Sequence, residues 1–155
     1  MTELKEGTKA PEFSVKTNTG EVVSLKDFFG KKRVVLYFYP KDDTPGCTKE
    51  ACGLRDSFKE IEAKDTVILG VSPDGAESHN KFIEKFSLPF LLLCDEDKKI
   101  SKDYGVWAKK QLYGKEYMGI LRTTFIIGKD SKIEKIYRNV KPEGHNEEIL
   151  TFLKG

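Results

Sequence analysis

The sequence predicts a three-layer α/β sandwich with a mixed central sheet. Three apolar runs lack the alternation of half-exposed strands, which is typical of strands covered on both faces of a largely parallel sheet. Helical patterns separate these runs, and the chain closes with a hairpin followed by a last helix. The three runs are Val34 to Tyr39, Val67 to Val71 and Phe90 to Leu93.

An N-terminal hairpin extension precedes the first of these strands. Residues 13–16 and 21–25 flank the turn sequence Thr-Asn-Thr-Gly, which favours two short antiparallel strands. After the first apolar run, residues 45 to 63 are expected to form one helix, because apolar residues recur there at spacings of 4, 3, 4 and 3. The residues of this stripe are Cys47, Ala51, Leu54, Phe58 and Ile61.

The second half of the chain continues the alternation of helices and strands. Three apolar residues at helical spacing before Pro89 predict another helix, and Gly105 is expected to end a short helix over residues 98–104. Residues 106–119 are polar and punctuated by glycine, so they are expected to carry a hairpin or a functional loop. Residues 123–127 and 132–137 then form the closing hairpin. The helical stripes are Phe82, Ile83 and Phe86, and at the end Ile149, Leu150 and Leu153.

Composition limits the class of protein. Leu, Ile, Val and Phe make up 42 of the 155 residues, enough for a folded chain of one domain over residues 1–155. The net charge of +2 is spread along the chain, which disfavours nucleic acid as the main partner. No apolar run exceeds seven residues, whereas a membrane span needs about 20. The start of the chain lacks the features of a secretory signal, so the cytoplasm is the expected compartment.

Cys47 lies where the first buried strand gives way to a helix. Thr44 is a favoured helix cap and Pro45 a favoured first helical residue, so Cys47 is the third residue after the cap. An anion at this position is stabilised by unpaired amide hydrogens and by the positive end of the helix dipole. The pattern therefore favours a reactive thiolate over an inert core cysteine.

Cys52 follows Cys47 by five residues. An ideal helix would separate their Cα atoms by about 8.6 Å, whereas a disulfide tolerates at most about 7 Å. A bond between them therefore requires the first turns of the helix to unwind. The spacing matches neither the Cys-x-x-Cys pattern of thiol–disulfide exchange proteins nor a four-ligand zinc pattern, so no metal is expected.

The other candidates carry weaker signals. Cys94 ends an apolar run and is expected to be structural. Arg122 enters an apolar strand, where a guanidinium is expected to pair with another group or to point at a site. His79 and His145 are expected to be surface residues at helix starts rather than ligands or bases.

These residues resemble those of a known family. Pro40-x-x-x-Thr44-x-x-Cys47 resembles the active-site motif of peroxiredoxins, which are thiol peroxidases built on an elaborated thioredoxin fold. Residues 46–56, Gly-Cys-Thr-Lys-Glu-Ala-Cys-Gly-Leu-Arg-Asp, resemble the bacterioferritin comigratory protein or peroxiredoxin Q subfamily, as do residues 113–127. The resemblance covers nearly the whole chain and implies a thioredoxin-like sandwich.

By this resemblance, Cys47 is the peroxidatic cysteine and Cys52 the resolving cysteine, while Thr44 and Arg122 bind peroxide and thiolate. Pro40 would shield the pocket, and Glu50 would orient Arg122 through an ion pair. The substrates would be hydrogen peroxide and organic hydroperoxides, which the protein would reduce in antioxidant defence. The reductant would be thioredoxin or a similar dithiol protein, and no cofactor would be needed. The resemblance also implies a monomer or a weak dimer.

Two alternatives remain open from the residues alone. One is a thiol–disulfide exchange protein, which the missing Cys-x-x-Cys motif disfavours. The other is a redox sensor or holdase-like module whose oxidised, unwound helix exposes an apolar face to a partner. An enzyme consumes many equivalents of peroxide with a reducing system, whereas a sensor stops after one.

Overall fold

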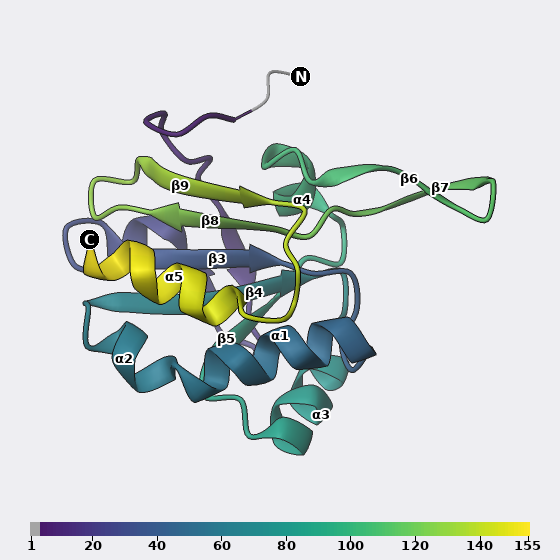
Figure 1. Cartoon of the computed structure of the whole chain (residues 1–155), viewed down its shortest axis with the longest axis horizontal. Helices are drawn as coiled ribbons and strands as arrows, with labels where there is room; N and C mark the ends of the chain where they lie inside the picture. The colour runs from purple at the N-terminus through teal and green to yellow at the C-terminus, as the bar shows by residue number, and fades with distance from the viewer. Residues whose placement is uncertain (1–3) are drawn as a thin grey trace.

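The computed structural model describes residues 4–155 and has a five-stranded mixed sheet at its centre (Figure 1). The strand order is β5-β4-β3-β8-β9; β3, β4 and β5 are parallel, and β8 is antiparallel to both of its neighbours. Strand β3 is therefore central, and both of its edges are paired. The strands are β3 (Arg33–Phe38), β4 (Thr66–Ser72), β5 (Leu91–Cys94), β8 (Thr123–Ile127) and β9 (Ile133–Arg138).

Strand β3 is apolar on both sides because each of its faces lies in a separate hydrophobic core. Val34, Leu36 and Phe38 point into one core, while Val35 and Tyr37 point into the other, as the two-residue period of a strand requires. All five are at most 1% exposed. The continuous apolar run that predicts a doubly covered strand thus corresponds to two packed layers.

Helices cover one face of the sheet, and smaller elements cover the other. The helices of the first face are α1 (Pro45–Asp56), α2 (Phe58–Glu62), α3 (Ala76–Phe86) and α5 (His145–Lys154), and all four contribute apolar residues to one core. In Figure 1, α5 and α1 lie in front of the sheet. The opposite core includes residues of the hairpin β1 (Ser14–Lys16) and β2 (Val22–Ser24), the 3-10 helix η1 (Leu25–Phe28) and α4 (Lys99–Asp103). The three layers and the N-terminal hairpin agree with the sequence prediction.

Residues 106–119 contain a hairpin rather than an irregular loop. Strands β6 (Trp107–Leu112) and β7 (Lys115–Ile120) pair antiparallel around Tyr113 and Gly114, which both have positive φ. The hairpin projects from the body of the molecule (Figure 1). The base of the hairpin continues directly into β8 through Arg122. The protruding hairpin is therefore joined to one of the residues predicted to form the site.

The expected helix over residues 45–63 is wrong in one respect, because the chain forms two helices that meet at Ser57. The Ser57 hydroxyl accepts a hydrogen bond from Asn146 Nδ2 of α5 at 2.8 Å. Ser57 is buried and has φ −99° and ψ 6°, outside the helical region. The apolar stripe continues across the break, which explains why periodicity alone did not reveal it.

Among residues 4–155, no helix has the length and apolar character needed to cross a bilayer.

Candidate active site

The loop between β3 and α1 places Cys47 in the first turn of a helix. Thr44 is the N-cap residue with extended backbone, and Pro45 occupies the first helical position, so Cys47 is the third helical residue. Its side chain is buried in the core beneath α1. The helix start predicted from Thr44 and Pro45 is thus present, and it directs backbone amides towards the thiol region.

Arg122 makes the polar contact that defines the site. Its Nη2 lies 3.2 Å from Cys47 Sγ, although 75 residues separate them in sequence. Its Nη1 lies 3.4 Å from Glu50 Oε1, forming an ion pair with a buried carboxylate one turn further along α1. Arg122 ends the β7–β8 connection, so the central sheet and α1 meet at this guanidinium. A sulfur anion at Cys47 therefore has a fixed positive partner.

Gly46 makes room for this guanidinium. A Cβ atom at Gly46 would lie 2.7 Å from Arg122 Nη2 and 3.4 Å from Pro142 Cγ. A side chain at this position would therefore push against the guanidinium group that contacts Cys47. Glycine is required here for close approach rather than for an unusual backbone angle.

Glu50 is a titratable group held in an apolar setting. Burial raises the pKa of Glu50 from 4.5 to about 7, and Arg122 acts in the opposite direction. Its Oε2 atom has no hydrogen-bond partner among the residues that the structure describes, and the same is true of the nearby Tyr37 hydroxyl. Burial, followed by the charges of Glu50 and Cys47, raises the pKa of Tyr37 well above 10. The site therefore contains two buried polar atoms without a hydrogen-bond partner among the described residues.

Glu50→Gln is expected to remove a pH-dependent loss of stability. Because the carboxyl pKa is higher in the folded chain than in the unfolded chain, the unfolded state releases its proton first as the pH rises. The wild-type free energy of unfolding should therefore fall between about pH 4.5 and pH 7 and then level off, by about 3 kcal/mol in total from this group.

Urea unfolding of the wild type and Glu50→Gln at pH 5 and pH 8 measures this effect. All other titrating groups are common to both proteins, so the difference between their two pH dependences reports Glu50. Equal pH dependences in the two proteins would contradict the raised pKa.

The other predicted site residues lie in the loop before Cys47 or on the same helix. The Thr44 hydroxyl donates to the Lys41 carbonyl at 3.0 Å rather than capping the helix, which leaves its lone pairs able to accept a hydrogen bond. Pro40 is half-buried directly after Tyr39, at the start of the same loop. Cys52 is half-buried on the same helix as Cys47, and both are free thiols.

Cys94 lies at the end of β5 and is also a free thiol. Burial raises the pKa of this thiol, and the carboxylates of Glu96, Asp42 and Asp74 raise it further. Such surroundings disfavour a thiolate, in contrast to the cationic partner of Cys47.

The expectation that His79 and His145 lie on the surface is wrong, although both lie at helix starts. Both side chains are at most 1% exposed. His145 Nε2 lies 2.8 Å from Thr124 Oγ1 of β8, and burial lowers its pKa while the bond to Glu148 opposes that effect. A polar ring survives burial here because its nitrogens find partners.

Lys110 is a second cation near the site that sequence reasoning missed. Its Nζ donates to the Ile120 carbonyl at 3.0 Å across the β6–β7 hairpin. Burial and then repulsion by Arg122 lower its pKa, while Cys47 acts in the opposite direction. No local sequence pattern marks this lysine, because its position depends on hairpin register.

Comparisons with known proteins agree with this geometry. The AhpC/TSA family matches residues 7–136. Peroxiredoxin Bcp of Bacillus subtilis strain 168 is 52% identical over 148 residues, which covers 96% of this chain and 94% of that protein. Peroxiredoxin Bcp of Escherichia coli K12 is 46% identical over 154 residues, which covers 99% and 98%.

Solved structures show the same similarity. A variant of Xylella fastidiosa PrxQ superposes with a TM-score of 0.93 at 32% identity, covering 99% of this chain and 98% of that one. The bacterioferritin comigratory protein of Xanthomonas campestris, whose structures address alkyl peroxide reduction, gives a TM-score of 0.90 at 32% identity over 97% and 98% of the two chains. The chain therefore belongs to the AhpC/TSA family and, within it, to the Bcp or peroxiredoxin Q peroxidases.

Proposed function

We propose that this peroxidase reduces hydrogen peroxide and organic hydroperoxides through Cys47, with Cys52 as the resolving cysteine and thioredoxin or a similar dithiol protein as the reductant. The observation that carries the proposal is the 3.2 Å contact between Arg122 Nη2 and Cys47 Sγ at the start of α1. The alkyl peroxide reduction attributed to the Xanthomonas campestris protein supports organic hydroperoxides as substrates. The physiological role is antioxidant defence.

The first step oxidises Cys47. Its thiolate sulfur attacks the terminal oxygen of the hydroperoxide, so that a sulfur–oxygen bond forms while the O–O bond breaks. Sulfur loses two electrons and becomes a sulfenic acid, and the departing alkoxide or hydroxide takes a proton to leave as alcohol or water. The side chains described above supply the whole of this step, without a cofactor.

Arg122 and Thr44 act on the charge that moves during this step. The guanidinium stabilises the thiolate before attack and can follow the negative charge onto the breaking O–O bond, because its Nη groups form a planar fork. The Thr44 hydroxyl oxygen accepts the hydrogen of the hydroperoxide, since its own hydrogen is committed to the Lys41 carbonyl. Pro40 limits access of water from the start of the loop.

The second step forms a disulfide. The Cys52 thiol gives up its proton and attacks the sulfenic sulfur of Cys47, so that a sulfur–sulfur bond forms while the sulfur–oxygen bond breaks, and the hydroxide that leaves takes up a proton to become water. Both cysteines lie within the continuous helix α1, so the first turns of that helix must unwind before the sulfur atoms can meet. The dithiol reductant then exchanges with this disulfide and restores both thiols.

Coupled turnover is the direct test of the proposal. With thioredoxin, its reductase and NADPH, the protein should consume many equivalents of peroxide per chain. Consumption that stops after one equivalent would favour a redox sensor.

We place the enzyme in the cytoplasm and expect it to be a monomer or a weak dimer. Analytical ultracentrifugation of the reduced and oxidised forms would test the oligomeric state.

Cys52→Ser is expected to leave the first step intact and to block the second. One equivalent of peroxide should convert the wild type to a form two mass units lighter, corresponding to a disulfide linking residues 47 and 52. The variant should instead retain a sulfenic acid and pass to sulfinic acid as peroxide is increased. Intact-mass and peptide-mass spectrometry measures both.

Cys94→Ser is the matched control, because it also replaces one thiol by a hydroxyl but lies at the end of β5. It should form the same disulfide as the wild type. A disulfide that persists in Cys52→Ser and vanishes in Cys94→Ser would transfer the resolving role to Cys94.

A further inference from the structure

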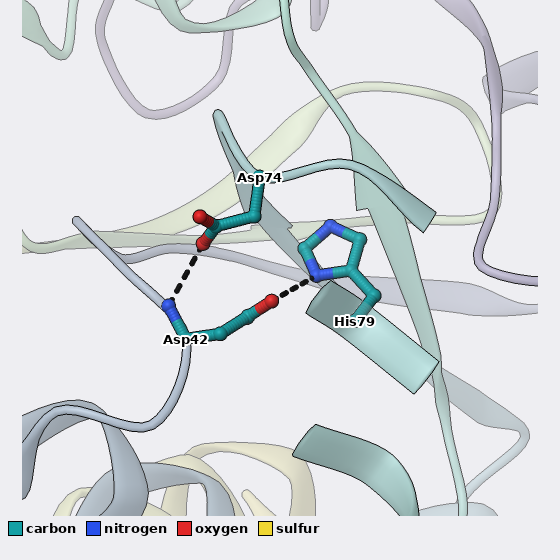
Figure 2. A group of neighbouring side chains, drawn as sticks. All are labelled: Asp42, Asp74 and His79. Atoms are coloured by element: carbon teal, nitrogen blue, oxygen red, sulfur yellow. Dashed lines mark hydrogen bonds and ion pairs between the residues drawn. The ribbon is translucent and has the colours of Figure 1, made fainter. Parts of the chain in front are cut away.

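A buried hydrogen-bond network joins the active-site loop to helix α3. Asp42 lies in the loop between Pro40 and Thr44, and its carboxyl group is hydrogen-bonded to three side chains. Tyr39 donates to Oδ1 at 2.5 Å; Oδ2 lies 2.8 Å from Ser78 Oγ and 2.7 Å from His79 Nδ1. Figure 2 shows the Asp42 carboxylate meeting the imidazole ring, while the Asp42 backbone nitrogen faces the Asp74 carboxylate.

The backbone of the loop is held as well. The Asp42 amide donates to Asp74 Oδ2 at 2.8 Å, and the same oxygen accepts from Ser72 Oγ at the end of β4 (Figure 2). Asp42 is thus held by Tyr39, which directly follows β3, by Asp74 in the loop after β4, and by two side chains of α3. Further titratable groups face this region: Cys94 at the end of β5 interacts with the carboxylates of Asp42 and Asp74, and Asp43, Glu77 and Lys81 line the same surface pocket as Asp42.

Hydrogen-bond accounting defines the protons in this network. His79 Nε2 lies 2.9 Å from the Leu93 carbonyl, which can only accept, so Nε2 carries a hydrogen. Asp42 Oδ2 and His79 Nδ1 then need one proton between them, whichever atom holds it. The two groups form a pair with no net charge that is almost completely shielded from solvent. Both ring nitrogens of His79 are hydrogen-bonded within the protein. The network therefore serves to hold Asp42 and its loop in position.

The network acts close to the reacting sulfur. Asp42 precedes the helix cap Thr44 by two residues and Cys47 by five. Loss of the His79 ring would leave the Asp42 carboxylate buried with only hydroxyl partners, at a cost that displacement of the loop into water would relieve. Displacement of this loop shifts Thr44 and the first turn of α1 away from Arg122.

We propose that His79 is a positioning residue for the peroxidase reaction, which with Asp42 holds the β3–α1 loop in the arrangement that presents Thr44 and Cys47 to the hydroperoxide. The inference rests on the proposed function. It adds that the network affects the rates of the two reaction steps in opposite directions. Oxidation of Cys47 needs the ordered loop, whereas disulfide formation needs the start of α1 to unwind. The network therefore speeds the first step and restrains the second.

His79→Gln tests this division between the two steps. In a Cys52→Ser background, where only the first step proceeds, His79→Gln should lower the second-order rate constant for oxidation by hydrogen peroxide about tenfold, as a small misplacement of reacting groups does. With Cys52 present, rapid-quench mass spectrometry should show that the disulfide forms from the sulfenic acid at least as fast as in the wild type.

Asp42 variants provide a rescue test that does not depend on His79→Gln folding. In Asp42→Asn, the amide oxygen can accept from Tyr39 and the amide nitrogen can donate to neutral His79, so most of the network survives. Its oxidation rate should stay within about threefold of the wild type, while Asp42→Ala should lose about tenfold. Lys81→Ala, on the exposed side of α3, is the matched control and should match the wild type.

The outcomes separate the two proposals. A wild type that peroxide fails to oxidise at Cys47 would refute the proposed function. If the wild type reacts, then equal oxidation rates in the wild type and His79→Gln, or equal slowing of both steps, would overturn the role of His79 alone.

Discussion

Cys47→Ser should reduce peroxide consumption to the uncatalysed background. A serine hydroxyl at this position stays protonated at neutral pH, and the Arg122 guanidinium cannot convert it into a nucleophile comparable to a thiolate. The measurement is NADPH oxidation coupled through thioredoxin reductase and thioredoxin at fixed peroxide concentration. The fold should survive, because serine is slightly smaller than cysteine and the core beneath α1 is otherwise unchanged.

Cys94→Ser controls for the loss of a thiol as such and is expected to retain turnover. Circular dichroism of both variants distinguishes loss of chemistry from loss of structure. Peroxidase turnover that persists in folded Cys47→Ser would remove Cys47 from the nucleophilic role and would require a different sulfur.

Arg122→Met should lower kcat/KM for hydrogen peroxide by about 10²- to 10³-fold, the range measured when one donor that stabilises developing charge is removed. Methionine keeps most of the side-chain volume but removes the partner of both Cys47 and Glu50. Arg122→Lys should lose less activity, because it keeps the charge but cannot donate to the sulfur and the carboxylate through one planar group. Competition kinetics against a peroxide reporter of known rate measures the oxidation step directly.

Lys109→Ala is the matched control, since it removes an exposed cation from the adjoining hairpin. Its kcat/KM should equal that of the wild type. If Arg122→Met and Lys109→Ala showed the same small change, the contact between Arg122 and Cys47 would have no role in the reaction.

The elements that the sequence predicts well are those with a complete local signal. The run through β3 and the Thr44-Pro45 helix start both depend on neighbouring residues, and the structure contains both. The break at Ser57 depends instead on a hydrogen bond from Asn146, 89 residues away. Similarly, the residues alone predict that Arg122 pairs with some group, but they do not say which; only the family resemblance assigns it to the Cys47 thiolate, from which Arg122 Nη2 lies 3.2 Å.

Helical spacing carries a local signal for the burial of His79. His79 precedes Phe82, Ile83 and Phe86 by three, four and seven residues, which places it on the buried face of α3. His145 likewise precedes Ile149 and Leu153 by four and eight. Residue type favoured the surface for both, whereas helical spacing favoured the core. The partners of each ring could not be inferred, because Asp42 and Thr124 belong to other elements.

The break between α1 and α2 has a consequence for the durability of the enzyme. Asn146 holds Ser57 against α5, and Arg55 Nη1 donates to the Phe86 carbonyl at 2.8 Å, so the C-terminal end of α1 is tethered to two neighbouring helices. If the start of α1 unwinds as proposed, melting from Cys47 should therefore stop before it reaches Ile61. The oxidised chain should then offer proteases only a short segment and keep its apolar interior covered through repeated catalytic cycles.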